Sequence, residues 1–116
     1  PQLIQTPSAH NLDTHPPLGQ SAARIFGILA CAEKVFISFD IDGLDRKLCP
    51  FTGTPVPGGF ELDQVFYLFT KLLESGKKIV GFDLNEVGIG GDTDWDANVG
   101  ARALYKLCNL LATSNS

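Results

Sequence analysis

The sequence predicts an α/β domain with a parallel sheet, because two short apolar runs flank a strongly amphipathic segment. The runs span residues 35–39 and 79–84, and both combine β-branched and aromatic side chains. Such continuous apolar runs are typical of strands that are covered on both faces. The segment between them repeats its apolar residues at the period of a helix. A strand, a helix and a second strand in this order predict a parallel, right-handed crossover.

The segments before the first strand divide into two parts. Residues 1–17 combine prolines with polar residues and lack an apolar period, so we expect a loop or a severed connection there. From residue 18 the pattern changes, and apolar residues at helical spacing predict a helix that runs to about Ala32. We therefore take residues 18–116 as the folded part of the chain.

Two more helices follow the first strand. The amphipathic segment begins at Leu62, and Gly76 provides a plausible stop for its helix. After the second strand, Asp94 or Asp96 can cap a last helix, which we expect to end before the polar tail at residues 113–116.

Composition limits the possible functions. The chain has 116 residues and 44% hydrophobic content, enough for one domain but about half of what a three-layer α/β enzyme needs, so we expect part of a larger fold. The net charge of −4 and the scattered cations disfavour a nucleic-acid partner. The absence of a long apolar run disfavours a membrane span, and the three separated cysteines predict reduced thiols in a cytoplasmic protein.

Carboxylates follow both predicted strands. Asp40 and Asp42 come after the first strand, and Glu86 comes after the second. Because ligands of open α/β sheets bind beyond the carboxyl ends of the strands, these residues are candidates for one site. Strand alternation would place Asp40 and Asp42 on the same side of the strand, with their Cα atoms about 6 to 7 Å apart. There they could bind one metal centre. An ordinary pair of turn or capping carboxylates explains the spacing equally well.

Longer motifs favour the metal site. The segment Ser38–Asp45 is followed by Thr52–Gly59, then by Gly81–Val87 and by Trp95–Arg102. Together these motifs resemble the ureohydrolase family, which contains arginase, agmatinase, guanidinobutyrase and formimidoylglutamase. The resemblance extends over roughly residues 35–110. It implies that the chain is the C-terminal part of a three-layer α/β/α fold.

The resemblance also implies roles for individual residues. Asp40 and Asp42 would bind metal, with Asp40 bridging two manganese ions, and Glu86 would hold the guanidinium-like end of the substrate beside Thr54. Asp40 and Glu86 would be the catalytic residues. These roles suit the chemistry, since manganese accepts carboxylate ligands and a planar carboxylate matches a planar guanidinium through paired hydrogen bonds. Two such ions can supply hydroxide near neutral pH.

The implied reaction is manganese-dependent hydrolysis of a guanidino or formimino C–N bond in a small molecule. Agmatine is the first choice of substrate, with urea as a product, and a homo-oligomer is expected for the full-length enzyme. The family draws histidine ligands from upstream motifs that this sequence lacks. His10 and His15 lie in a proline-rich stretch and do not match those motifs. We therefore expect only part of the site, and an inactive isolated chain.

Two positions depart from the family pattern. Arg46 stands where proline is usual, and Phe51 stands where a small residue is usual. Both fall in the loop that would cover the metals, so they affect the expected shape of the substrate pocket.

Two alternatives remain from the sequence. Residues 36–43 also resemble the first motif of haloacid-dehalogenase-like magnesium phosphatases, in which the first aspartate is a nucleophile. That family has threonine where this chain has Leu44, and it does not account for Thr52–Gly59. The second alternative is a non-catalytic ureohydrolase fragment, whose poorly covered strands would favour association.

Overall fold

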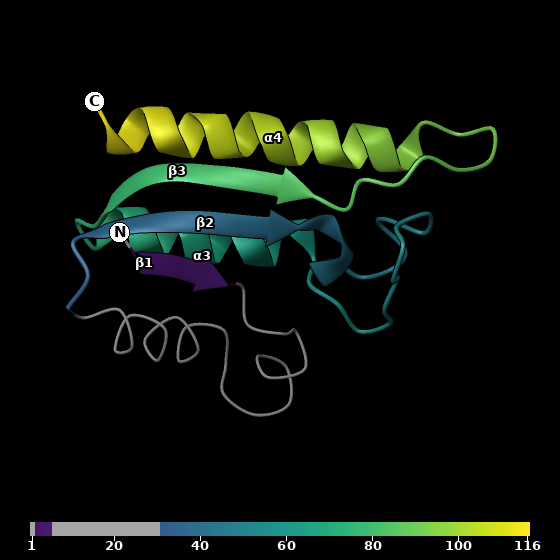
Figure 1. Cartoon of the computed structure of the whole chain (residues 1–116), viewed down its shortest axis with the longest axis horizontal. Coiled ribbons are helices and arrows are strands. Elements are labelled where there is room, and N and C mark those ends of the chain that lie inside the picture. The colour runs from purple at the N-terminus through teal and green to yellow at the C-terminus, as the bar shows by residue number, and fades with distance from the viewer. Residues whose placement is uncertain (1, 6–30) are drawn as a thin grey trace.

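The computed structural model of the chain defines residues 2–5 and 31–116. Within these residues, three strands form one sheet in the order β1-β2-β3, and both neighbouring pairs are parallel. Two long helices in the same residues accompany the sheet (Figure 1). The elements are β1 (Gln2–Gln5), β2 (Lys34–Asp40), the 3-10 helix η1 (Ile41–Gly43), α3 (Leu62–Glu74), β3 (Lys78–Asn85) and α4 (Trp95–Ser114). The α/β class and the parallel pairing of the two expected strands are confirmed.

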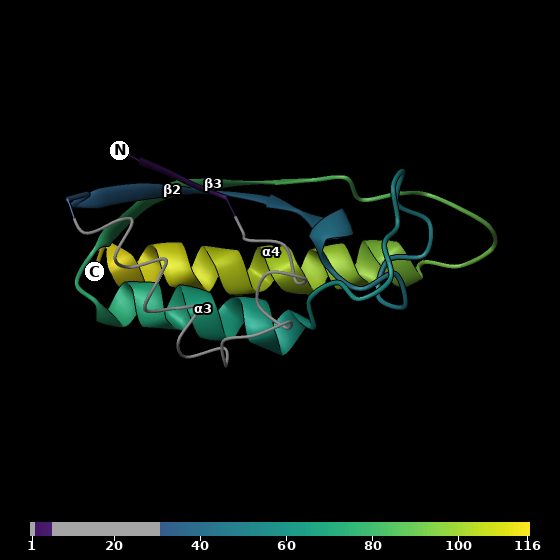
Figure 2. The same ribbon diagram turned by 90° about the horizontal axis from the view of Figure 1, so that it is seen from below.

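The described helices cover one face of the sheet. Figure 2 shows α3 and α4 on the same side of β2 and β3. Alternate residues of β2, namely Val35, Ile37 and Phe39, are buried against these helices. Phe36 and Val80 lie outside this core, and Val80 is 39% exposed. The described helices therefore cover one face of the sheet, and cover on the other face stays a prediction, because the helix expected from residue 18 lies outside the described residues.

Helix α3 matches its predicted span closely. Its buried face packs an aromatic cluster, in which the rings of Phe66 and Phe69 meet edge to face at 5.5 Å and both approach Phe39. Glu61 and Gln64 form a capping box at the start, with the Glu61 N–H donating to Gln64 Oε1 at 2.9 Å. The predicted stop is also confirmed, since the last turn is followed by Gly76 at φ 86°.

Helix α4 is longer than the sequence analysis predicted. It begins after Asp94, and Val99, Ala103 and Leu107 on one side of it are buried in the core, but it continues to Ser114. The Ile79 N–H donates to Ser114 Oγ at 2.7 Å, and Asn115 Nδ2 donates to the Ile79 carbonyl at 2.9 Å. The expected polar tail is thus partly helical, because these side chains satisfy the edge of β3. None of the described helices has the length and hydrophobicity that crossing a bilayer requires.

Part of the expected N-terminal loop is a strand. Residues 2–5 form β1 and pair with β2 from Gln2 opposite Val35 to Gln5 opposite Ser38. A four-residue strand is too short to produce a recognisable period, and its pairing depends on the neighbouring edge that β2 offers. The assignment of a loop to residues 2–5 was therefore wrong. The helix expected from residue 18, the boundary at residue 17, and both His10 and His15 lie outside the described residues.

Candidate functional site

The carboxyl ends of β2 and β3 lie level with one another. Asp40, the last residue of β2, is paired with Asn85, the last residue of β3. Glu86 follows immediately, and both Asp40 and Glu86 are exposed. The parallel register therefore places the first predicted ligand and the predicted substrate anchor at the same edge of the sheet, as the sequence analysis expected.

Asp42 lies near this edge, but its backbone conformation differs from the one expected. It lies in η1 and not in an extension of β2, and the Leu44 N–H closes this turn by donating to the Ile41 carbonyl at 3.0 Å. Ile41 is fully buried. The strand-alternation argument was wrong, because burial of Ile41 turns the chain into the core directly after Asp40. Asp40 and Asp42 nevertheless line one cavity of about 260 Å³.

The loop after η1 contacts the Asp pair. Thr54 Oγ1 donates to Asp42 Oδ2 at 2.6 Å, and the second Asp42 oxygen takes no part in this bond. Thr54 was expected beside the substrate group that Glu86 holds, which stays a prediction, and its direct contact with Asp42 is an additional finding. This hydrogen bond fixes the orientation of the Asp42 carboxylate at the cavity.

The same loop also contacts the segment that follows β3. Thr52 is 5% exposed, and its Oγ1 donates to the Glu86 carbonyl at 2.7 Å. A β-carbon on Gly53 would lie 3.8 Å from Glu86 Oε2, so the Glu86 carboxylate lies over this glycine. Glu86 adopts a φ of 68°, a left-handed conformation that is uncommon outside glycine. The Thr52–Thr54 segment therefore connects Glu86 with Asp42.

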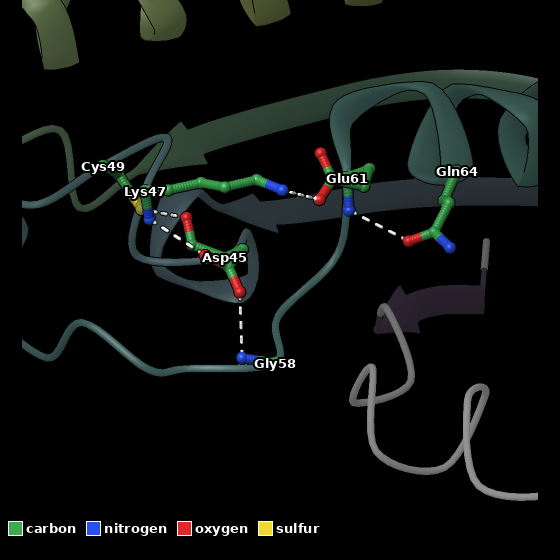
Figure 3. A network of polar contacts seen from close by, with 6 residues as sticks. All are labelled: Asp45, Lys47, Cys49, Gly58, Glu61 and Gln64. Atoms are coloured by element: carbon green, nitrogen blue, oxygen red, sulfur yellow. Dashed lines mark hydrogen bonds and ion pairs between the residues drawn. The ribbon is translucent and has the colours of Figure 1, made fainter.

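Asp45 anchors the base of this loop, a role that the sequence analysis did not assign. Its carboxylate accepts hydrogen bonds from the N–H groups of Lys47 at 3.0 Å and Gly58 at 2.9 Å (Figure 3). The Lys47 N–H contributes most to holding the pKa of Asp45 below its usual value. The Lys47 side chain forms an ion pair with Glu61 at the start of α3. Two segments of the loop are thereby joined below the site.

Gly59 has a steric role in the same loop. A β-carbon at this position would overlap the backbone of Leu44 and would lie 2.5 Å from the Asp45 nitrogen. The close approach of the two backbone segments allows the Asp45 N–H to donate to the Phe60 carbonyl at 2.9 Å. The absence of a side chain at Gly59 therefore permits the close folding of the loop.

Cys49 is a buried thiol beneath the site. Its Sγ donates to the Ile41 carbonyl at 3.2 Å, and the residue has no exposed surface. Burial raises the pKa of the Cys49 thiol from 9.0 to about 11, and the negative charges of Asp96, Asp42 and Asp45 act in the same direction. All three cysteines are free, and Cys31 and Cys108 are exposed.

Thiol alkylation should distinguish these cysteines. At pH 8 we expect iodoacetamide to modify Cys31 and Cys108 readily and Cys49 at least ~100-fold more slowly, because alkylation requires the thiolate. The raised pKa of Cys49 in the folded state also predicts a pH-dependent contribution of this thiol to the free energy of unfolding. The contribution is fully present below pH 9 and is lost as the pH rises through 11. Mass spectrometry of tryptic peptides measures the rates. Rapid labelling of Cys49 without unfolding would contradict this assignment.

Asp96 is a second residue whose role the sequence did not reveal. It was considered only as a possible helix cap, yet it is 2% exposed, and its Oδ2 accepts the Phe51 N–H at 3.0 Å. The other oxygen, Oδ1, has no hydrogen-bond partner among the described residues. Asp96 therefore connects the first turn of α4 to the loop that carries Thr52 and Thr54.

The donor set is suitable for a hard metal ion but is small. Asp40 and Asp42 offer carboxylate oxygens at one cavity, and manganese accepts such ligands. Among residues 2–5 and 31–116, no cluster of three or more histidine, cysteine, aspartate or glutamate side chains has the geometry of a metal site. The described residues can therefore offer two carboxylates to a metal ion.

Comparisons with known proteins give consistent results. The sequence profile of the Arginase family matches residues 4–109. An agmatinase from Pyrococcus horikoshii is 44% identical over 83 residues, which cover 69% of this chain and 28% of the agmatinase. A guanidinopropionase from Pseudomonas aeruginosa is 39% identical over 97 residues, which cover 80% of this chain and 28% of that protein. The crystal structure of Bacillus subtilis arginase superposes with a TM-score of 0.72 at 26% identity, covering 89% of this chain and 34% of the arginase. The chain thus spans about a quarter of the length of these curated relatives.

Proposed function

This chain belongs to the arginase family, and we propose that it supplies part of the active site of a manganese-dependent ureohydrolase. The observation that carries the proposal is the contact of one loop with both functional groups at the sheet edge. Thr54 binds the Asp42 carboxylate, and Thr52 binds the Glu86 main chain. The proposed metal ligands and the proposed substrate anchor are thereby held as one unit.

In this proposal, Asp40 and Asp42 would hold manganese through their carboxylate oxygens. When bound, the metal pair supplies a nucleophilic water near neutral pH. Thr54 keeps one oxygen of Asp42 engaged, which leaves the other oxygen for the metal. Two carboxylates are too few for two ions, so the remaining ligands, among them the histidines typical of the family, are proposed to lie outside the described residues.

Glu86 is proposed to bind the guanidinium group of the substrate. Its carboxylate is exposed at the sheet edge, where it can accept two parallel hydrogen bonds from a planar cation. Thr52 restrains the Glu86 main chain, and Gly53 leaves the space beside the carboxylate free of a side chain. A substrate held in this way would lie at the same edge of the sheet as Asp40 and Asp42.

Agmatine is the proposed substrate, and hydrolysis of its guanidino C–N bond would release urea. The agmatinase from Pyrococcus horikoshii, at 44% identity, supports this choice over the guanidino compound for which the relative from Pseudomonas aeruginosa, at 39% identity, is named. We also propose that the full-length enzyme is cytoplasmic and forms a homo-oligomer. Membership in the arginase family argues against the phosphatase alternative.

The isolated 116-residue chain provides the first test. We expect it to bind manganese weakly and to release no appreciable urea from agmatine or arginine, because two carboxylates cannot hold two ions tightly. Calorimetric titration with manganese and a colorimetric urea assay measure the two properties. Tight binding of two ions, or turnover that is abolished by Asp40→Asn, would show that the chain supplies a complete site.

A further inference from the structure

Phe51 and a glycine-rich loop fit together next to Glu86. The loop spans Gly88–Gly91, and a β-carbon on Gly90 would lie 2.5 Å from Phe51 Cδ1 and 2.7 Å from Cγ. The Phe51 ring also lies beside Gly91, at 3.4 Å from the position of an added β-carbon. The ring of Phe51 therefore occupies space that exists only because position 90 lacks a side chain.

The backbone of Phe51 is held from two sides. Its N–H donates to the buried carboxylate of Asp96 at 3.0 Å. Its carbonyl lies so close to Gly88 that a β-carbon there would overlap the Phe51 oxygen. The next residue, Thr52, donates to the Glu86 carbonyl at 2.7 Å. Phe51 thus fixes the segment that begins at Thr52 against Glu86 and the glycine-rich loop that follows it.

We propose that Phe51 is a positioning residue for Glu86, and that Gly90 is required to accommodate its ring. Packing of the ring on Gly90 keeps Thr52–Thr54 pressed against the Glu86 segment, so that the Glu86 carboxylate stays over Gly53. The inference rests on the proposed function, in which Glu86 anchors the guanidinium group. It also explains how the chain tolerates a large residue at position 51, where the family pattern has a small one.

Glycine substitutions test the packing directly, because an added β-carbon would meet different atoms of Phe51 at positions 88 and 90. Alanine at position 90 would meet the side chain of Phe51, whereas alanine at position 88 would meet its backbone. We expect Gly90→Ala and Gly88→Ala each to lower the Tm of the full chain by roughly 5 to 10 °C. Phe51→Ala should recover much of the loss in Gly90→Ala and none of the loss in Gly88→Ala. Ile89→Ala is the matched control, since Ile89 is fully exposed in the same loop.

Kinetics in the complete manganese-loaded enzyme test the positioning role. We expect Phe51→Ala to raise KM for agmatine about 10-fold, with kcat and metal content nearly unchanged, because a misplaced anchor weakens substrate and transition state alike. Phe51→Leu should retain a KM close to that of the unmodified enzyme, because leucine still fills the space over Gly90.

Each of the two experiments can contradict one part of the proposal independently of the other. Equal recovery of Gly88→Ala and Gly90→Ala by Phe51→Ala, or no recovery of either, would overturn the proposed packing. An unchanged KM in Phe51→Ala would overturn the positioning role even if the packing is correct. If the unmodified enzyme hydrolyses no guanidino compound, the proposed function itself fails and the positioning role falls with it, whereas the Tm comparison still decides whether Phe51 and Gly90 are coupled.

Discussion

Replacing Glu86 by glutamine in the complete enzyme should lower kcat/KM for the guanidino substrate by roughly 30-fold to several thousand-fold, with the metal centre intact. This loss corresponds to about 2 to 5 kcal/mol, the cost of removing one charge from a hydrogen-bonded ion pair that substrate binding would shield from water. Glutamine has nearly the shape of glutamate, and the bond from Thr52 goes to the Glu86 carbonyl, so the variant keeps the loop contact. The effect should therefore be on binding and turnover.

The alternative explanation is that Glu86 only braces the loop that follows β3. In that case Glu86→Gln would lower the free energy of unfolding and leave the kinetics of the folded fraction nearly unchanged. Kinetics corrected for metal content and for folded protein separate the two explanations. Glu74→Gln is a suitable control, because Glu74 is an exposed carboxylate at the end of α3, and its surface ion pair with Lys71 contributes little. Near-normal turnover in Glu86→Gln would remove Glu86 from the active site.

The sequence was sufficient to predict the elements that build the site. Strands β2 and β3 are continuous apolar runs. In α3, apolar residues recur at helical spacing along its whole length, and a glycine follows its end. Each of these elements can therefore be predicted from its own residues. The shared edge of Asp40 and Glu86 then followed from parallel pairing. These features depend on neighbours in sequence or on a general rule of sheet topology.

Features that depend on tertiary packing were not predictable in the same way. Asp42 lies in a turn because Ile41 is drawn into the core, a result of burial that the spacing of two aspartates does not reveal. Asp96 contacts Phe51 across 45 positions of sequence, and no local pattern distinguishes this contact from an ordinary helix cap. The pairing of β1 likewise depends on the edge of β2. Roles for the site residues could be assigned only by resemblance to the family.

Replacing Asp42 by asparagine should have the opposite consequence to the Glu86 substitution, with metal lost first. The Asp42 carboxylate has two oxygens, and Thr54 Oγ1 already donates to one of them at 2.6 Å. Asparagine has a single acceptor oxygen, so its amide cannot accept this bond and also present a second oxygen to the metal. Loss of the negative charge further weakens attraction for a divalent cation. We expect the manganese affinity of the complete enzyme to fall by roughly 100-fold or more.

Activity of Asp42→Asn should then recover in part when manganese is raised to saturating concentrations, because Glu86 and the substrate pocket are unchanged. Metal analysis after dialysis and a manganese titration of turnover measure both effects. Thr54→Val is the informative companion variant, since it removes only the hydroxyl that orients Asp42 and should weaken metal binding by about 10-fold to 100-fold. Thr54→Ser keeps the hydroxyl and should remain close to the unmodified enzyme. Full retention of two manganese ions by Asp42→Asn at low metal concentration would exclude Asp42 as a ligand.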